Sequence, residues 1–271
     1  MKSNARETPA ASFETLSRLA GIASEAGRAV MRFYGQPSGV EQKGNLGPVS
    51  DADRASNRII VDALCSWDCT VPIVSEESDI ADYPTRCHWT RFWLVDPLDG
   101  TKEFLRGDPD FTVNIALIEG DRPVAGVVFA PAADVMYVAA RGLGAWRHVG
   151  GGSAERLQSA PPLPGQALRV VESRSHRSDA LDRFLASLPV AERVPVGSSL
   201  KFCRVAEGRA DLYARMSPIM EWDTAAGDCI YRYSGASAER PSPLRYNSRE
   251  LRFPQFVIGI DANHVDRQVA S

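Results

Sequence analysis

Residues 92–104 read Phe-Trp-Leu-Val-Asp-Pro-Leu-Asp-Gly-Thr-Lys-Glu-Phe, an apolar run that stops at Asp96 and Asp99. The run has the length and composition of a buried strand, and α/β proteins bind their ligands at the carboxyl ends of such strands. The Pro and Gly that follow predict a tight turn, and a helix can begin at Thr101 with its free N–H groups facing an anion. This segment therefore predicts an α/β fold with a hard-cation site beside a phosphate site.

The composition of the 271 residues is that of an ordinary globular protein, with 44% hydrophobic and 24% charged residues. The net charge of -3 gives no reason to expect nucleic-acid binding. No apolar stretch reaches the roughly 20 residues that cross a bilayer, and residues 1–8 lack the apolar core of a signal peptide. We expect a cytoplasmic monomer or homodimer with a small-molecule substrate, no integral membrane segment and no nucleic-acid partner.

The five cysteines are odd in number and scattered along the chain, which argues against a disulfide framework. Cys65 and Cys69 lie one helical turn apart, as zinc ligands can, but no second pair of Cys or His residues at zinc-binding spacing follows them. Reduced thiols and no zinc site are therefore expected.

The first half of the chain predicts two helices followed by an antiparallel sheet. Apolar residues recur at steps of three and four across residues 13–33, and a second helix is predicted over residues 51–67 with Ser50 or the following Asp as its cap. A short strand is expected at residues 71–75. Turn signals separate three further strands and predict an antiparallel meander. These strands are expected at residues 111–118, 124–130 and 134–140.

The second half of the chain predicts a separate α/β domain. Residues 150–165 are rich in Gly and Pro and poor in apolar residues, as domain boundaries are. Short strands and helical segments alternate after that boundary. The strands are expected at residues 168–172, 193–196 and 256–260, and the helices near residues 179–188, 199–207 and 224–233. We predict an N-terminal α+β domain over residues 1–160, carrying most metal ligands, and a C-terminal α/β domain over residues 161–271.

Four acidic residues that end apolar runs or begin helices are candidates to meet at one point: Glu76, Asp96, Asp99 and Asp223. Carboxylates gather in a small volume only when cations neutralise them. Oxygen ligands without His or thiolate indicate magnesium, manganese or calcium, and magnesium suits phosphate chemistry best. Two such ions can hold both the attacking water and the leaving oxygen, so hydrolysis of a phosphate monoester is predicted. Taken singly, each acid also fits the role of a helix cap or a turn residue.

Three strings of residues resemble the inositol monophosphatase superfamily of magnesium-dependent, lithium-sensitive phosphatases: Asp96-Pro-Leu-Asp-Gly-Thr101, Glu76-Glu-Ser78 and Trp222-Asp-Thr-Ala-Ala-Gly227. The resemblance extends over most of the chain. It implies a layered αβαβα sandwich of the inositol monophosphatase and fructose-1,6-bisphosphatase type, with the active site between two lobes. Three further strings resemble the CysQ-type 3'(2'),5'-bisphosphate nucleotidases of that superfamily: Lys102-Glu-Phe104, Ser173-Arg-Ser-His176 and Ser198-Ser-Leu-Lys-Phe-Cys203.

The resemblance implies roles for individual residues. Ligands of two or three Mg²⁺ ions are implied at Glu76, Asp96, Leu98 (through its carbonyl), Asp99 and Asp223. Asp53 and Thr101, with Glu76, would polarise the attacking water, because a Thr hydroxyl is a poor base without a neighbouring carboxylate. The N–H groups of Gly100 and Thr101 would hold the scissile phosphate.

Substrate contacts are implied at Gly100, Thr101, His176, Ser198, Lys201, Arg215 and Asp223. A bisphosphate needs an extra cation for its second charged group, and Lys201 is the best candidate. The alternative for Lys201 is a solvated lysine on a helix surface, and His176 could instead cap or pack against the helix that follows it. Lys43 lies in a segment suited to a lid over the active site. A surface lysine without such a role is nearly as good an explanation.

The implied activity is Mg²⁺-dependent hydrolysis of adenosine 3',5'-bisphosphate to AMP and phosphate, a reaction of sulfate assimilation, with 3'-phosphoadenylyl sulfate as a second candidate substrate. The first alternative is an inositol monophosphatase or another sugar phosphatase, because a fold does not determine a substrate. An alternative of another class is a non-catalytic partner of the transcription machinery. The chain departs from the nucleotidase pattern at residues 228–243, which puts the substrate more in doubt than the reaction.

Overall fold

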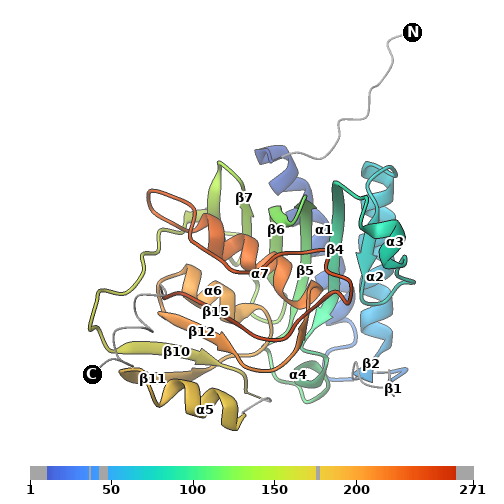
Figure 1. The fold of residues 1–271 in the computed structure, drawn as a ribbon. Coiled ribbons are helices and arrows are strands. Elements are labelled where there is room, and N and C mark those ends of the chain that lie inside the picture. The colour runs from blue at the N-terminus through green and yellow to red at the C-terminus, as the bar shows by residue number, and fades with distance from the viewer. Residues whose placement is uncertain (1–10, 37, 43–47, 175–177, 261–271) are drawn as a thin grey trace.

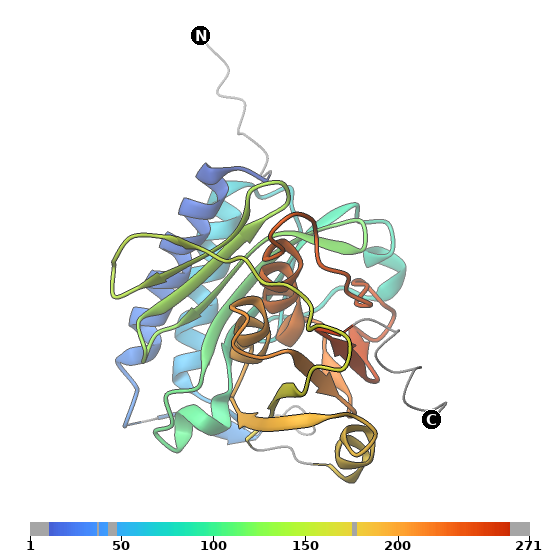
Figure 2. The ribbon, with the colours of Figure 1, turned by 90° about the vertical axis from the view of Figure 1, so that its left-hand side faces the viewer.

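The computed structural model describes residues 11–36, 38–42, 48–174 and 178–260. Its helices and sheets stack in layers, as the two views of the ribbon show (Figures 1 and 2). Within the described residues, none of the helices combines the length and the apolar character that crossing a membrane requires.

The large sheet consists of seven strands: β3 (Ile73–Ser75), β4 (Arg91–Asp99), β5 (Thr112–Glu119), β6 (Arg122–Ala130), β7 (Val135–Ala140), β8 (Gly144–Val149) and β9 (Glu155–Arg156). They lie side by side in chain order; β3 and β4 are parallel and the other neighbours antiparallel. The expected antiparallel meander is confirmed. It continues through β8 and β9, which the sequence pattern does not predict because these strands near the sheet edge carry few buried apolar residues.

Two helices cover one face of the large sheet, α1 (Phe13–Met31) and α2 (Asp51–Trp67). Both confirm the helices expected from apolar periodicity. α2 begins after Ser50, whose backbone N–H and hydroxyl both donate to Asp53 Oδ2, at 2.8 and 2.6 Å. This capping arrangement holds the Asp53 side chain at the first turn of the helix.

The small sheet has the strand order β11-β10-β12-β15. Its strands are β10 (Leu168–Glu172), β11 (Val190–Pro195), β12 (Leu212–Arg215) and β15 (Phe256–Ile258). β10 is parallel to both of its neighbours, whereas β15 is antiparallel to β12. The sequence predicts β10, β11 and β15 but not the four-residue β12.

Three helices complete the layers: α5 (Asp179–Leu185), α6 (Leu200–Ala206) and α7 (Trp222–Tyr233). One apolar core joins Leu94 and Ala116 of the large sheet, Phe202 of α6, Ala226 of α7 and Tyr213 of the small sheet. α6 and α7 therefore lie between the two sheets, and α5 packs on the outer face of the small sheet. The order of layers is helices, sheet, helices, sheet, helix, so the expected αβαβα sandwich is confirmed.

The predicted domain boundary falls in the segment between β9 and β10, the last strand of the large sheet and the first of the small sheet. The division into domains at residues 1–160 and 161–271 stays a prediction. Six short elements connect the layers: β1 (Glu41–Gln42), β2 (Pro48–Val49), α3 (Tyr83–Arg86), α4 (Thr101–Leu105), β13 (Ile219–Met220) and β14 (Arg252–Phe253).

Residues 228–234 of the unusual segment after Gly227 are buried, whereas residues 236–239 are exposed. Arg232 of α7 is buried and pairs with the buried Asp228, with 2.8 Å between Arg232 Nε and Asp228 Oδ2. Its guanidinium also donates to the Leu244 carbonyl at 2.9 Å, and the Tyr246 hydroxyl donates to Asp228 Oδ2 at 3.0 Å. The larger side chains of α7 therefore anchor the chain that follows it, which runs back toward the helix start.

Candidate active site

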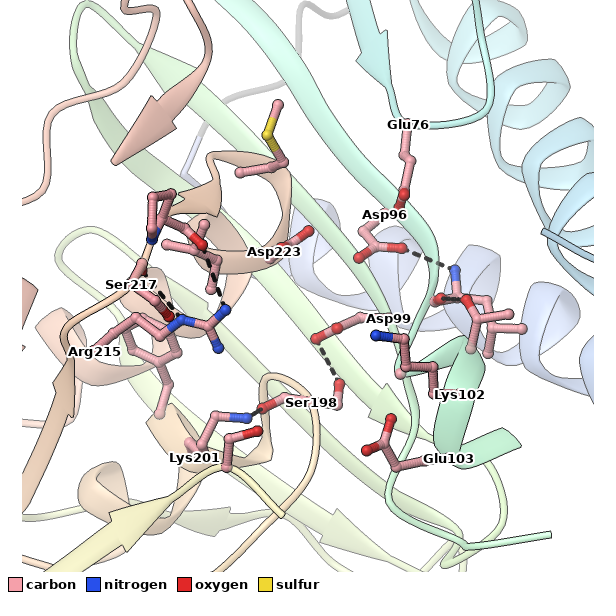
Figure 3. A pocket seen from close by; sticks show the side chains of 18 of the residues that line it. Glu76, Asp96, Asp99, Lys102, Glu103, Ser198, Lys201, Arg215, Ser217 and Asp223 are labelled. Atoms are coloured by element: carbon pink, nitrogen blue, oxygen red, sulfur yellow. Dashed lines mark hydrogen bonds between the residues drawn. The ribbon is translucent and has the colours of Figure 1, made fainter. Parts of the chain in front are cut away.

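A cavity of about 480 Å³ lies between the carboxyl end of β4 and the starts of α6 and α7. Figure 3 shows Glu76, Asp96 and Asp99 on one side of this cavity and Lys201 and Arg215 on the other. Every predicted site residue that the structure describes lines it except Asp53, which lies behind Thr101: the lining includes Glu76, Asp96, Leu98, Asp99, Gly100, Thr101, Ser198, Lys201, Arg215 and Asp223.

Three of the predicted carboxylates form a compact group. Among the described residues, Glu76, Asp96 and Asp223 each offer an oxygen atom, and these oxygens lie within 4.8 Å of one another. Burial raises the pKa of Glu76 to about 9 and that of Asp223 to about 8, and neighbouring carboxylates add to both shifts. The pKa of the fully buried Asp96 also lies well above its ordinary value, because of burial and then of Glu76.

These raised pKa values have two causes, which are burial away from water and the proximity of other carboxylates; at Asp223 the cations Arg215 and Lys201 oppose the shift only in part. A divalent cation would remove that repulsion and stabilise the ionised forms. The oxygen-only donor set fits a hard cation such as magnesium, manganese or calcium. Neither Cys65 nor Cys69 belongs to this candidate metal-binding group, which lies among the described residues.

Asp99 lies in the same cavity, and its carboxylate contacts the C-terminal half of the chain. Asp99 Oδ2 accepts a hydrogen bond from Ser198 Oγ at 2.6 Å and a longer one from Asn114 Nδ2 at 3.4 Å. Asn114 Nδ2 also donates to Ser199 Oγ at 3.0 Å, and Ser199 Oγ donates to the carbonyl of Asp223 at 2.8 Å. Asp99 and Asp223 are thus joined by one chain of polar contacts.

The Thr101 hydroxyl has two acceptors at 3.2 Å, Asp53 Oδ1 and the Leu98 carbonyl. Gly100, the residue before α4, has φ +89°, and an added Cβ would lie 3.0 Å from the Asp110 carbonyl. This left-handed conformation turns the chain from β4 into α4 and favours glycine. Burial raises the pKa of Asp53, although hydrogen bonds from Ser50 oppose the shift.

Lys201 lies in the cavity wall and is only 5% exposed, so the alternative of a solvated surface lysine is wrong. Its ammonium donates to the Ser198 carbonyl at 2.6 Å and lies 5.6 Å from the centre of the Tyr213 ring. Burial lowers its pKa to about 8, an effect that Asp99 partly opposes. The Arg215 guanidinium donates to the carbonyls of Ser217 and Pro218, at 3.3 and 3.4 Å.

Sequence reasoning misses three polar residues that position this site: Thr112, Asn114 and Ser199. Thr112 and Asn114 are buried on β5 and two positions apart, so their side chains share one face of the strand. Polar residues at this spacing in an apolar strand are the signal that could have indicated them. The predicted contacts His176 and Lys43 lie outside the described residues.

Residues 14–247 match the model of the inositol monophosphatase family. The 3'(2'),5'-bisphosphate nucleotidase CysQ of Escherichia coli strain K12 is 43% identical over 242 residues, which cover 87% of this chain and 95% of that protein. CysQ from Bacteroides thetaiotaomicron, a solved structure, has a TM-score of 0.76 and 34% identity and covers 91% of this chain and 97% of its own.

A second solved structure, the extragenic suppressor protein suhB from Bartonella henselae, matches with a TM-score of 0.74 and 25% identity, over 95% of this chain and 98% of its own. The match to the family model and the identity to CysQ both extend over most of the chain. The chain therefore belongs to the inositol monophosphatase family, whose enzymes are metal-dependent.

Proposed function

We propose that the protein is a metal-dependent 3'(2'),5'-bisphosphate nucleotidase that hydrolyses the 3'-phosphate of adenosine 3',5'-bisphosphate and yields AMP and phosphate. The observation that carries this proposal is one cavity that holds both the Glu76–Asp96–Asp223 carboxylate group and the buried cation Lys201. The carboxylate group fits the metal chemistry of phosphate hydrolysis, and the cation fits a substrate with a second phosphate. The 43% identity to a nucleotidase of this name supports the substrate class.

The metal is proposed to be Mg²⁺, as two or three ions. Its ligands would be the carboxylates of Glu76, Asp96, Asp99 and Asp223 and the carbonyl of Leu98. When bound, magnesium supplies an activated water and neutralises the charge that develops on the phosphoryl group. The raised pKa values of Glu76, Asp96 and Asp223 support this assignment, because each marks a carboxylate that a nearby cation would stabilise in its ionised form.

Thr101 and Asp53 are proposed to handle the proton of the attacking water, together with Glu76. The Thr101 hydroxyl can orient that water while its own proton points to Asp53 Oδ1, 3.2 Å away. Asp53 Oδ2 is already engaged by Ser50, so the carboxylate presents its other oxygen to Thr101. The N–H groups of Gly100 and Thr101 are proposed to hold the scissile phosphate at the start of α4.

Substrate selection is proposed to rest on Ser198, Lys201 and Arg215, with Asp223 and His176 as further contacts. Lys201 and Arg215 lie on the wall of the cavity opposite Asp96, so a substrate whose scissile phosphate lies at the carboxylate group can extend toward them. 3'-Phosphoadenylyl sulfate is a second proposed substrate, because it also carries an anionic group at the end of the molecule that would extend toward Lys201 and Arg215. We retain the predicted cytoplasmic location and the monomeric or homodimeric state as parts of this proposal.

Measurement of phosphate release from adenosine 3',5'-bisphosphate tests the metal-dependent reaction. The wild type should be active with Mg²⁺ and inactive after chelation, with activity restored when Mg²⁺ is returned. Asp96→Asn should lose activity by about a hundredfold or more, because a buried ligand loses its charge without a change of shape. Normal turnover after chelation, or in Asp96→Asn, would contradict the proposal.

A further inference from the structure

Glu221, the residue immediately before α7, is completely buried, and its carboxylate binds one loop. Its Oε2 accepts the backbone N–H of Asn247 at 2.7 Å, and its Oε1 accepts that of Ser248 at 2.9 Å. The carbonyl of Glu221 accepts hydrogen bonds from Thr224 and Ala225 in the first turn of α7. Glu221 therefore fixes residues 247–248 to the start of the helix that carries Asp223.

Asn247 connects this helix start to the other side of the molecule. Its side-chain amide forms two hydrogen bonds with one residue: Nδ2 donates to the Arg86 carbonyl at 2.7 Å, and Oδ1 accepts from Arg86 Nη1 at 2.8 Å. Asn247 has φ +69°, a left-handed conformation that Asn tolerates better than most residues. Arg86 is 3% exposed, and its guanidinium also donates to the carbonyls of Ala81 and Arg249.

Arg86, Asn247 and Glu221 thus link the two sides of the candidate metal site. Arg86 ends α3, in the connection between Glu76 and the strand that carries Asp96. Glu221 lies two residues before Asp223. None of the three linking residues lines the cavity. The buried hydrogen bonds through Asn247 fix the separation of these two sides.

We propose that Asn247 is a positioning residue that holds Asp223 at its distance from Glu76 and Asp96 and thereby sets the affinity of the site for its metal. This inference rests on the proposed function, because it takes these three carboxylates as metal ligands. Residues that orient metal ligands without touching the metal commonly change metal affinity by 10- to 100-fold when they are replaced.

The test is calorimetric titration of the full chain with Mg²⁺ in the absence of substrate, so that the readout is binding and not turnover. Asn247→Gly removes both side-chain hydrogen bonds and accepts the left-handed backbone. We expect its dissociation constant for Mg²⁺ to rise about tenfold. The matched control is Arg245→Ala in the same loop, whose exposed side chain bonds to the Ser242 and Leu244 carbonyls and to Asp121. Its dissociation constant should stay within about twofold of the wild type.

Arg86→Lys provides a second variant if Asn247→Gly does not fold. The lysine keeps the charge but lacks the planar guanidinium group, whose two Nη atoms donate to Asn247 and to the Arg249 carbonyl. This variant should therefore also weaken Mg²⁺ binding. Chemical unfolding without metal is measured in parallel. A folded Asn247→Gly or Arg86→Lys that is less stable but binds Mg²⁺ as the wild type does would overturn the inference and leave the link a purely structural role.

Asp223→Asn separates a failure of this inference from a failure of the proposed function. If Asp223→Asn binds Mg²⁺ as tightly as the wild type, the assignment of the metal ligands is wrong and the proposed function fails with it. If Asp223→Asn weakens binding and Asn247→Gly does not, the metal site stands and only the positioning role is refuted.

Discussion

Ser198 and Asp99, 99 positions apart in the chain, meet at the cavity, where Ser198 Oγ donates a 2.6 Å hydrogen bond to Asp99 Oδ2. Ser198 has φ +53°, a left-handed conformation that residues other than Gly, Asn and Asp rarely adopt. Its backbone is held by neighbours on both sides: an added Cβ at Gly197 would lie 2.6 Å from the Asp110 carbonyl, and Ser199 contacts Asp223 and Asn114. The strained serine therefore orients a predicted metal ligand.

Replacement of Ser198 should reduce activity more than stability. Ser198→Ala removes a hydrogen bond to a charged group, which is worth about 1.5–3 kcal/mol, so kcat/KM should fall by about 10- to 150-fold. Ser198→Gly should lose activity to a similar extent and be more stable to urea than Ser198→Ala, because glycine accepts the left-handed φ without strain. Kinetics and urea unfolding of the pair check this, and full activity in Ser198→Gly would show that the hydroxyl has no role.

The Thr101 hydroxyl should be needed for turnover and not for metal binding. Thr101→Val keeps the shape of the side chain and removes its proton path to Asp53, so kcat should fall by about 10²- to 10⁴-fold, the range of a general base contribution. Thr101→Ser keeps the hydroxyl and should retain most activity. Steady-state kinetics at saturating Mg²⁺ measures both. Equal kcat values for the valine and serine variants would contradict the proposed role.

Lys201 should discriminate between substrates with one and two phosphates. Lys201→Met keeps much of the buried apolar volume and removes the charge, so kcat/KM for adenosine 3',5'-bisphosphate should fall by about 10- to 150-fold, the value of one charge-assisted hydrogen bond. For adenosine 3'-phosphate the fall should be about threefold or less. Similar losses on both substrates would refute the selectivity role.

The same lysine should make substrate binding depend on pH. Because burial lowers the pKa of Lys201 to about 8, the ammonium loses its proton as the pH rises through 8, and KM for the bisphosphate should then increase. The effect on stability has the opposite sign: between pH 8 and 10.5 the unfolded chain holds more protons at this lysine, so its contribution to stability rises with pH. Lys201→Met should lack both trends, which pH profiles of KM and of urea unfolding measure against the wild type.

The buried pair of Asp228 and Arg232 should matter for stability and little for catalysis. Arg232→Met leaves the Asp228 carboxylate buried without its cation and should cost about 3–5 kcal/mol of unfolding free energy. The double variant Asp228→Asn, Arg232→Met should recover part of that loss, because no unpaired charge remains. Urea unfolding of the two variants tests this, and a single variant as stable as the wild type would show that the pair does not hold the following segment in place.

The sequence predicts the layers of the fold better than its smaller elements. α1 and α2 are predictable because their apolar residues recur along one face over four or more turns, and β4 to β7 because each is a run of buried residues. β12, β13 and β14 contain four residues or fewer, too short for any periodicity to register. β12 forms because β10 and β15 supply its hydrogen-bond partners, and β13 and β14 form because they pair with each other.

The sequence likewise predicts some features of the candidate site and not others. Glu76, Asp96 and Asp223 could be predicted because each belongs to a characteristic local string of residues, and the structure brings them together. The contacts of Asn114 with Ser199 and of Asn247 with Arg86 could not, because they join positions 85 and 161 apart and no local pattern indicates which distant residue is the partner. The buried state of Lys201 also follows from tertiary packing, since its position on a short helix does not determine its exposure.

A comparison of kcat/KM for three substrates in the presence of Mg²⁺ tests the central claim most directly: adenosine 3',5'-bisphosphate, inositol 1-phosphate and fructose 1,6-bisphosphate. The bisphosphate nucleotide should be hydrolysed with a kcat/KM at least about a hundredfold above that of either sugar phosphate. Of the three substrates, it alone carries its second anionic group on an adenosine, and we expect that group to contact Lys201 and Arg215 in the cavity wall. Faster turnover of inositol 1-phosphate or fructose 1,6-bisphosphate would contradict the nucleotidase assignment.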